Sequence, residues 1–196
     1  MAPVRKGVPK ARTEPKVVEE RQGTAPTHVL MRVRSEGGLT VEAHSTMIAE
    51  HGVAMFGKRG VPMGVDSRNT INRQIADGTP TYLFVTTREG WNGEYVTYRC
   101  RLRKVLPEVA PDQLRLVPRY YVSEARKVAT WFEIASFDRL SREEMNSIFV
   151  KSSGRSIMSV IKSSATLFHV GLGTPAISQP IKRTTFHRPN RTAECC

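Results

Sequence analysis

The residues with the clearest chemical potential are three arginines in the segment EYVTYRCRLRKV, residues 94–105. Arg99, Arg101 and Arg103 occupy alternate positions, and apolar residues lie between them. This alternation predicts a β-strand with one packed face and one solvated face. Neighbouring guanidinium groups repel one another unless an anion lies beside them. We therefore expect this row to contact an anionic partner, such as the phosphates of nucleic acid.

The composition points to the same kind of partner. The 196 residues carry a formal net charge of +12, and the sequence pI is about 10.1. Such a balance predicts attraction to polyanions, most often nucleic acid, although a merely soluble basic protein has a similar composition. Of the three cysteines, Cys195 and Cys196 are adjacent at the end of the chain. This is no disulfide framework, so we expect a reducing, cytoplasmic setting.

Aromatic residues are few, and several lie close to basic residues or begin apolar segments. The candidates for contact with a base are Phe56, Tyr82, Trp91 and Trp131, and Lys58 and Arg59 follow the first of them. Aromatic rings beside cationic groups offer unstacked bases a stacking surface and offer phosphates a counter-charge. Each ring taken singly is equally compatible with ordinary core packing.

The segment SSGRS, residues 152–156, precedes a short amphipathic pattern. Ser153, Gly154 and Ser156 could bind an anion through the start of a helix, with Arg155 beside it. A simple helix cap with a solvated arginine explains the same residues, and both interpretations remain open.

Enzymatic chemistry has little support in the sequence. No pair among the five histidines has metal-ligand spacing beside a cysteine or a carboxylate cluster. Glu143 and Glu144 are adjacent, so they point in different directions on a helix and cannot form an acid–base pair. No glycine-rich nucleotide-binding loop opens onto a helix. We therefore expect no catalytic residues, no metal and no cofactor. Because no apolar run approaches the roughly 18 residues of a membrane span, we expect no membrane partner.

The chain divides into a basic N-terminal tail at 1–27, expected to be disordered, a folded domain at 28–173 and a flexible basic C-terminal tail at 174–196. Strands are expected at 28–35, 53–60, 79–88, 94–105, 130–141 and 166–170, and helices at 37–52, 66–78, 141–148 and 152–165. The expected helix caps are Thr40, Asp66 or Ser67, and a Ser141–Glu144 capping box, with Gly52 and Gly78 ending helices. Short helices between hairpin-like strands predict an α+β fold, a small mixed β-barrel with peripheral helices.

Several of these segments resemble a known family. The stretches TVEAHSTMIAEHGVAMFGKRG, INRQIADGTPTYLFVTT and YVTYRCRLRKV resemble the first half of EVE-type domains of the PUA-like superfamily. The stretch TWFEIASFDRLSREEMNSIFVKSSGRSIMSVIKSSATLFHV resembles the second half, so the resemblance covers most of 28–170. Relatives of this kind form the N-termini of modification-dependent restriction enzymes.

The resemblance implies a PUA-like barrel that binds DNA or RNA and accepts a flipped, often modified base in an aromatic cage. The implied cage residues are Phe56, Tyr82, Trp91 and Trp131, and the implied phosphate contacts are Lys58, Arg59, Arg99, Arg101, Arg103 and Arg155. We therefore expect a non-catalytic nucleic-acid reader. The alternatives are a protein-interaction, adaptor or anti-defence protein that uses the same barrel, and a small nucleic-acid-processing enzyme. The sequence leaves the choice between DNA and RNA open.

Overall fold

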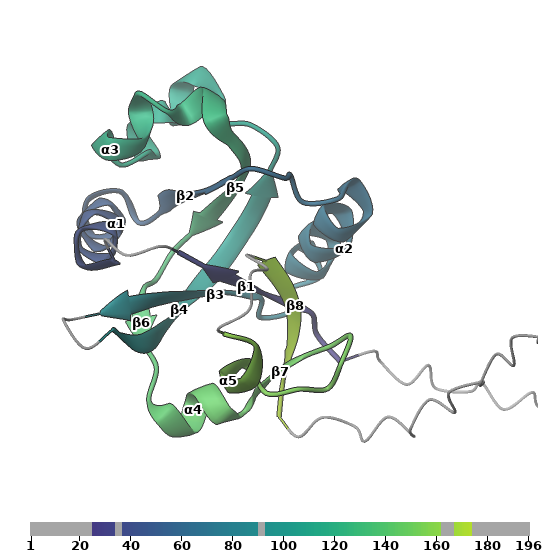
Figure 1. Ribbon diagram of the computed structural model, residues 1–196. Helices are drawn as coiled ribbons and strands as arrows, with labels where there is room; N and C mark the ends of the chain where they lie inside the picture. Colours follow the sequence, from purple (N-terminus) through teal and green to yellow (C-terminus); the bar gives the residue numbers. More distant parts are fainter. Residues whose placement is uncertain (1–24, 34–36, 90–92, 162–166, 174–196) are drawn as a thin grey trace, which may run out of the picture.

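The computed structural model describes residues 25–33, 37–89, 93–161 and 167–173 (Figure 1). Its elements are β1 (His28–Arg32), α1 (Gly37–His51), β2 (Ala54–Arg59), α2 (Val65–Ala76), β3 (Tyr82–Glu89), β4 (Glu94–Leu106), η1 (Pro111–Leu116), α3 (Arg119–Val122), η2 (Ala125–Lys127), β5 (Val128–Ile134), β6 (Asp138–Arg139), α4 (Arg142–Asn146), β7 (Ile148–Val150), α5 (Ile157–Val160) and β8 (Leu167–Leu172). The predicted tails lie outside the described residues, except for 25–27. The fold is mixed α+β, as expected.

The strands form one sheet of eight, in the order β2-β5-β4-β3-β1-β8-β7, with β6 beside β4. β1 and β3 are parallel, and the other neighbours are antiparallel. Within the described strands, β2 pairs only with β5 and β7 only with β8, so the sheet is open. The expected closure into a barrel is therefore not confirmed.

The 13-residue strand β4 lies between β5 and β3 in this sheet. β3 pairs with its first part, and β5 pairs with its second part after a register shift between Leu102 and Lys104. Both Leu102 and Val105 reach the same core cluster, so the two exposed residues between them, Arg103 and Lys104, interrupt the alternation there. That Arg103 continues the row of Arg99 and Arg101 therefore stays a prediction.

Helices cover both faces of the sheet (Figure 1). Met31 of β1 belongs to the largest core cluster, against which α1 and α2 pack through side chains such as Ile48 and Ile71. Leu30 belongs to a second cluster, which α4 and α5 cover through Met145 and Ile157. Because neighbouring residues of a strand point to opposite faces, these two cores lie on opposite sides of the sheet.

The connection between β4 and β5 folds into η1, α3 and η2 and adds a third core cluster. Trp131 packs there against Tyr121, with ring centroids 5.6 Å apart. The Tyr121 hydroxyl donates to the Gly57 carbonyl at 2.9 Å, and the His44 Nε2 lies 3.2 Å from the Met55 carbonyl. These two contacts occupy carbonyls of β2, which ends the sheet, and so protect its open edge.

The glycine stops are confirmed, since Gly52 and Gly78 have φ of 76° and 78° and follow α1 and α2. The Ser141–Glu144 capping box at α4 is also confirmed. The other caps are wrong. α1 already includes Thr40, and α2 begins at Val65 with Gly64 as its N-cap, which places Asp66 and Ser67 inside the first turn.

Candidate functional site

Tyr82, Arg99 and Arg101 lie together on the face of β3 and β4 that belongs to the second core cluster. Tyr82 is directly opposite Arg101, and Phe84 is opposite Arg99. The guanidinium carbons of both arginines lie 5.8 Å from the centroid of the Tyr82 ring. The ring is half-buried at the margin of the cluster. Two cations therefore flank one partly exposed aromatic side chain, which is the arrangement expected for contact with a base and its phosphates.

His28 of β1 supports Tyr82 from the other side. Its ring centroid is 5.3 Å from that of Tyr82, and its Nδ1 accepts the Tyr82 backbone N–H at 3.4 Å. Burial, and secondarily the charge of Lys151, lower the pKa of His28 from 6.5 to about 4. His28 is therefore neutral at pH 7 and holds Tyr82 in place without adding a charge.

Lys151 provides a third cation near this group. Its ammonium donates to the Ala25 carbonyl at 2.7 Å and to the Thr27 hydroxyl at 2.8 Å. Thr27 is itself fixed by Gln74, which accepts its backbone N–H at 2.8 Å and donates to its carbonyl at 3.0 Å. We refer to Tyr82, His28, Arg99, Arg101 and Lys151 together as the Tyr82 cluster.

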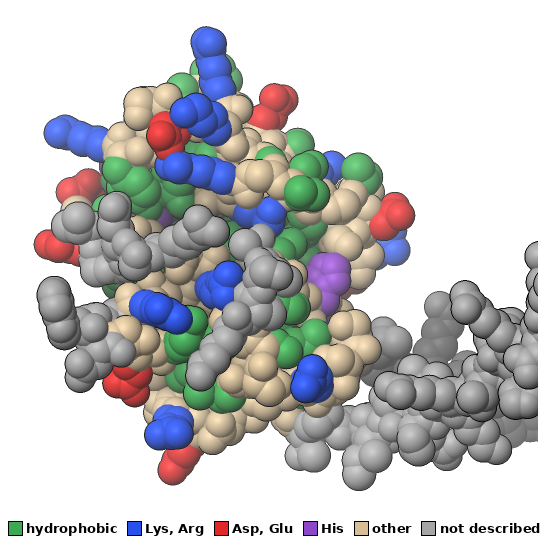
Figure 2. Space-filling view, in the orientation of Figure 1, with side chains coloured by type: hydrophobic (Ala, Val, Ile, Leu, Met, Phe, Trp, Pro, Cys, Tyr) green, Lys and Arg blue, Asp and Glu red, His purple; other side chains and the backbone are tan. Residues whose placement is uncertain are grey.

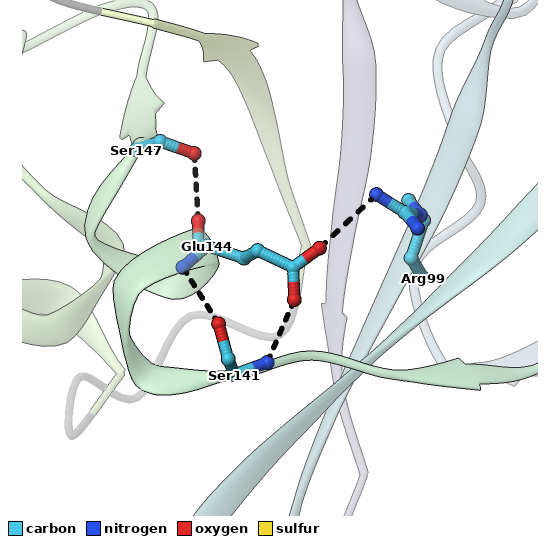
Figure 3. Close-up of polar contacts among 4 residues, drawn as sticks. All are labelled: Arg99, Ser141, Glu144 and Ser147. Carbon is cyan, nitrogen blue, oxygen red and sulfur yellow. Dashed lines mark hydrogen bonds and ion pairs between the residues drawn. The ribbon is translucent and has the colours of Figure 1, made fainter.

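Glu144 is the nearest carboxylate partner of Arg99, with Oε1 at 3.4 Å from Nη1 (Figure 3). Its Oε2 accepts the Ser141 N–H at 2.8 Å, and its own N–H donates to the Ser141 hydroxyl at 3.2 Å. The bond from the Ser141 backbone is the main reason why the pKa of Glu144 is lowered, and Arg99 contributes least. Because both side chains are about 40% or more exposed, the pair with Arg99 is weak and leaves the guanidinium able to bind another anion.

Two other predicted phosphate contacts, Lys58 and Arg59, have partners within the protein. The buried Lys58 ammonium donates to the Val61 carbonyl, and burial lowers the pKa of Lys58. Arg59 forms an ion pair with Glu124 of the η1–α3–η2 connection. Arg103 is exposed at the bulge, and Arg155 is exposed in the turn before α5. Among the residues that the structure describes, Arg99 and Arg101 are the predicted cations that lie over a predicted ring.

The predicted aromatic cage is not assembled in the structure. Phe56 is 0% exposed and stacks on His44 at a centroid distance of 4.6 Å. Trp131 is 2% exposed and belongs to the third core cluster. Both rings are core residues because helices and the η1–α3–η2 connection cover the two faces of β2 and β5. Trp91 lies outside the described residues, and among the predicted rings that are described Tyr82 is the one that is partly exposed.

The predicted anion site before α5 has local partners for its backbone groups. The Gly154 N–H donates to the Val150 carbonyl at 2.8 Å, and the Arg155 N–H donates to the Ser153 hydroxyl at 3.4 Å. The Ser156 hydroxyl caps α5 by accepting the Met158 N–H at 3.3 Å. These contacts favour the capping interpretation over an anion site.

Figure 2 shows Lys and Arg side chains near the centre of one face, over the region of β3 and β4, while most Asp and Glu side chains lie towards its outline. Among the described residues, no group of three or more His, Cys, Asp or Glu side chains could hold a metal ion. No helix in this part of the chain has the length and apolar character needed to cross a membrane.

The sequence did not single out His28 or Lys151, and it marked Glu144 for a capping box rather than for contact with Arg99. His28 is the first residue of β1, and the alternation of the strand expected at 28–35 already places it on the same face as Leu30. Its neighbourhood with Tyr82 depends on the parallel pairing of β1 with β3, and no local pattern encodes that pairing. Lys151 reaches the cluster only because β7 and β8 return beside β1.

Comparison with known proteins does not identify the chain. No family model, no curated protein and no solved structure matches it. The resemblance to EVE-type domains therefore rests on the sequence patterns alone.

Proposed function

We propose that this protein is a non-catalytic nucleic-acid reader that binds one base at Tyr82. The observation that carries the proposal is the convergence of Arg99 and Arg101 on the Tyr82 ring, each at 5.8 Å. Stacking of a base on an aromatic ring contributes about 1–3 kcal/mol. The two guanidinium groups supply phosphate contacts, and the net charge of +12 supplies longer-range attraction.

The proposal includes a relation to the PUA-like superfamily. The EVE-like sequence patterns and the α+β sheet with short helices support it. In this protein the base would contact Tyr82 rather than a cage of four rings. Discrimination of a modified base would then depend on how the modification changes stacking and the approach of Arg99 and Arg101.

A protein-interaction function is a second candidate, favoured by exposed apolar side chains outside the Tyr82 cluster. Val61 is 78% exposed and Val122 is 52% exposed. Their segments are neighbours, because Arg59 pairs with Glu124 and Tyr121 contacts Gly57. A partner protein bound there would bury apolar area that the fold leaves in water.

The test compares the double variant Arg99→Ala/Arg101→Ala with Arg115→Ala/Arg119→Ala. Both remove two positive charges, but Arg115 and Arg119 are exposed on the η1–α3–η2 connection. Binding to labelled oligonucleotides is measured at several salt concentrations. For single strands, loss of two phosphate contacts should reduce the slope of log affinity against log salt by about 1.4, since each contact contributes about 0.7. The control pair should change it much less.

Tyr82→Leu and Tyr82→Phe test the stacking component. Leucine keeps the apolar packing but removes the flat ring. Phenylalanine keeps the apolar packing and the flat ring. We expect a loss of roughly 5- to 150-fold for Tyr82→Leu and little change for Tyr82→Phe. Modified and unmodified oligonucleotides are compared in the same assay. Equal losses in the two double-arginine variants, with no effect of Tyr82→Leu, would show that the Tyr82 cluster is not the binding site.

A further inference from the structure

We infer that the base bound at Tyr82 is guanine, which donates from its N1–H and N2 amino group to the Glu144 carboxylate and accepts at O6 from Arg99. This specificity rests on the proposed function and names the base that it reads. It follows from the position of Glu144 beside Arg99 and from the donor pattern of the four bases.

Glu144 places a carboxylate next to a cation that lies over the Tyr82 ring. Its Oε1 is 3.4 Å from Arg99 Nη1, and Arg99 Cζ is 5.8 Å from the ring centroid. Because one C–N bond of about 1.3 Å joins these two contacts, Oε1 lies no more than about 10.5 Å from the centroid. A purine stacked off-centre on the ring, with a hydrogen bond at its edge, can span that separation.

The Glu144 carboxylate is held in place and still has acceptor capacity. Its Oε2 accepts the Ser141 N–H at 2.8 Å as part of the capping box at α4. An ionised carboxylate has about four lone-pair sites, and Ser141 and Arg99 use two of them. Since the side chain is 46% exposed, the other sites can accept hydrogen bonds from a ligand.

The charges beside the ring differ between the two arginines. Arg101 is opposite Tyr82 and, among the described residues, forms no ion pair with a carboxylate. Arg99 has Glu144 beside it, and the exposed Asp138 of β6 is its partner in the β4–β6 pair. This negative charge weakens the attraction of Arg99 for a phosphate but can accept hydrogen bonds from a base. Arg101 therefore suits a phosphate, and Arg99 with Glu144 suits the edge of a base.

Guanine matches this pair of groups better than the other bases do. Its Watson–Crick edge has two adjacent donors, N1–H and the N2 amino group, with the acceptor O6 beside them. Adenine, cytosine and thymine each offer a carboxylate one donor on that edge. The second hydrogen bond to a charged acceptor tightens binding by roughly 10- to 150-fold.

The same face of β3 and β4 has a second ring with a cation over it. Arg88 Cζ lies 4.9 Å from the Tyr95 centroid, and Arg88 Nη2 donates to the Tyr95 hydroxyl at 2.9 Å. Within the described residues, Arg88 forms no ion pair with Asp or Glu. A base stacked there would meet a cation without a paired carboxylate, so we expect no preference for guanine at that ring.

Fluorescence anisotropy measures the affinity for labelled five-nucleotide thymidine strands whose central base is varied. The central base is guanine, adenine, cytosine, thymine or hypoxanthine, which lacks the N2 amino group of guanine. The guanine strand should bind the wild type roughly 5- to 150-fold more tightly than the adenine, cytosine and thymine strands. The hypoxanthine strand has one donor fewer than guanine and should bind much as these three do.

Glu144→Gln tests the carboxylate without removing the helix cap, because glutamine also completes a capping box. Its amide has a single acceptor oxygen, so the preference for guanine should disappear. Glu143→Gln removes the same charge from the adjacent exposed residue, and Arg88→Ala removes the cation beside the other ring. Both control variants should keep the preference.

The outcomes separate base specificity from the proposed function. If Glu144→Gln tightens binding of all strands alike, Glu144 acts only as a repelling charge and the inference is wrong. Equal affinities of the wild type for all five strands would also overturn it. In both cases the proposed function stands if Tyr82→Leu and Arg99→Ala/Arg101→Ala still weaken binding. If these variants bind every strand as the wild type does, the proposed function itself is wrong.

Discussion

Acidification should destabilise this protein through His44. The His44 side chain is fully buried between α1 and β2 and stacks on Phe56. Burial lowers the pKa of His44 from 6.5 to about 4, while hydrogen bonds with the Thr40 and Met55 carbonyls oppose this shift to a lesser extent. The unfolded chain therefore binds a proton at His44 more readily than the folded protein does. The resulting stability is complete above about pH 6.5 and is lost as the pH falls towards 4.

The expected loss from His44 between pH 7 and pH 5 is about 2 kcal/mol, from a shift in pKa of 6.5 to about 4. Urea denaturation of the wild type and of His44→Phe at both pH values measures it. Phenylalanine keeps a ring beside Phe56 but cannot titrate. The wild type should lose about 2 kcal/mol more than the variant. His28 also has a lowered pKa, but its contribution occurs in both proteins and cancels.

The exposed His51 provides a matched control, because His51→Gln should follow the wild type at both pH values. Equal losses in the wild type and His44→Phe would refute the reasoning. A neutral imidazole has one N–H, yet Nδ1 lies 2.6 Å from the Thr40 carbonyl and Nε2 lies 3.2 Å from the Met55 carbonyl. Equal losses would mean that a doubly protonated ring, which donates to both carbonyls, compensates for its desolvation.

Two further predictions concern the margins of the sheet, and urea denaturation measures both. Tyr121→Phe removes the buried hydrogen bond to the Gly57 carbonyl and should lower the free energy of unfolding by about 1–2 kcal/mol; a change below about 0.5 kcal/mol would contradict a role in edge protection. In Gly171→Ala the added Cβ would lie 2.5 Å from the Phe149 ring across the β7–β8 pair, so we expect a loss of about 1–3 kcal/mol. Gly64→Ser, where nothing lies within 4 Å of the added Cβ, should cause no loss.

Local patterns predicted the elements that depend on local chemistry. The alternation of the β4 segment places Val96 and Arg99 on opposite faces. The capping box at Ser141 and the glycine stop at Gly52 also follow from short-range geometry. These signals fix where chain segments begin and end, so they recovered most strands and helices and brought Tyr82, Arg99 and Arg101 into the candidate set.

The features that the sequence patterns did not predict depend mainly on pairing between strands that are distant in the chain. β4 pairs with β6 at Tyr98 and Arg99 and with β5 from Leu102 onward, and no residue type within RLRK marks the bulge between Leu102 and Lys104. Lys58, expected as a phosphate contact, is an exception, because its ammonium donates to the Val61 carbonyl only three residues along the chain. The open sheet does depend on distant pairing. Closure depends on whether β2 and β7 meet, and neither segment carries a pattern that specifies this.

The η1–α3–η2 connection explains why Trp131, one of the predicted cage rings, is a core residue. Without a covering layer, the Trp131 face of β5 would be exposed and a ring there could meet a ligand. Tyr121 occupies that space and also binds the Gly57 carbonyl at the sheet edge. One connection thus protects an open edge and fills the site where a cage would form. Among the predicted cage rings that the structure describes, Tyr82 is then the one that stays partly exposed, where β3 begins and where Arg99 and Arg101 lie beside it.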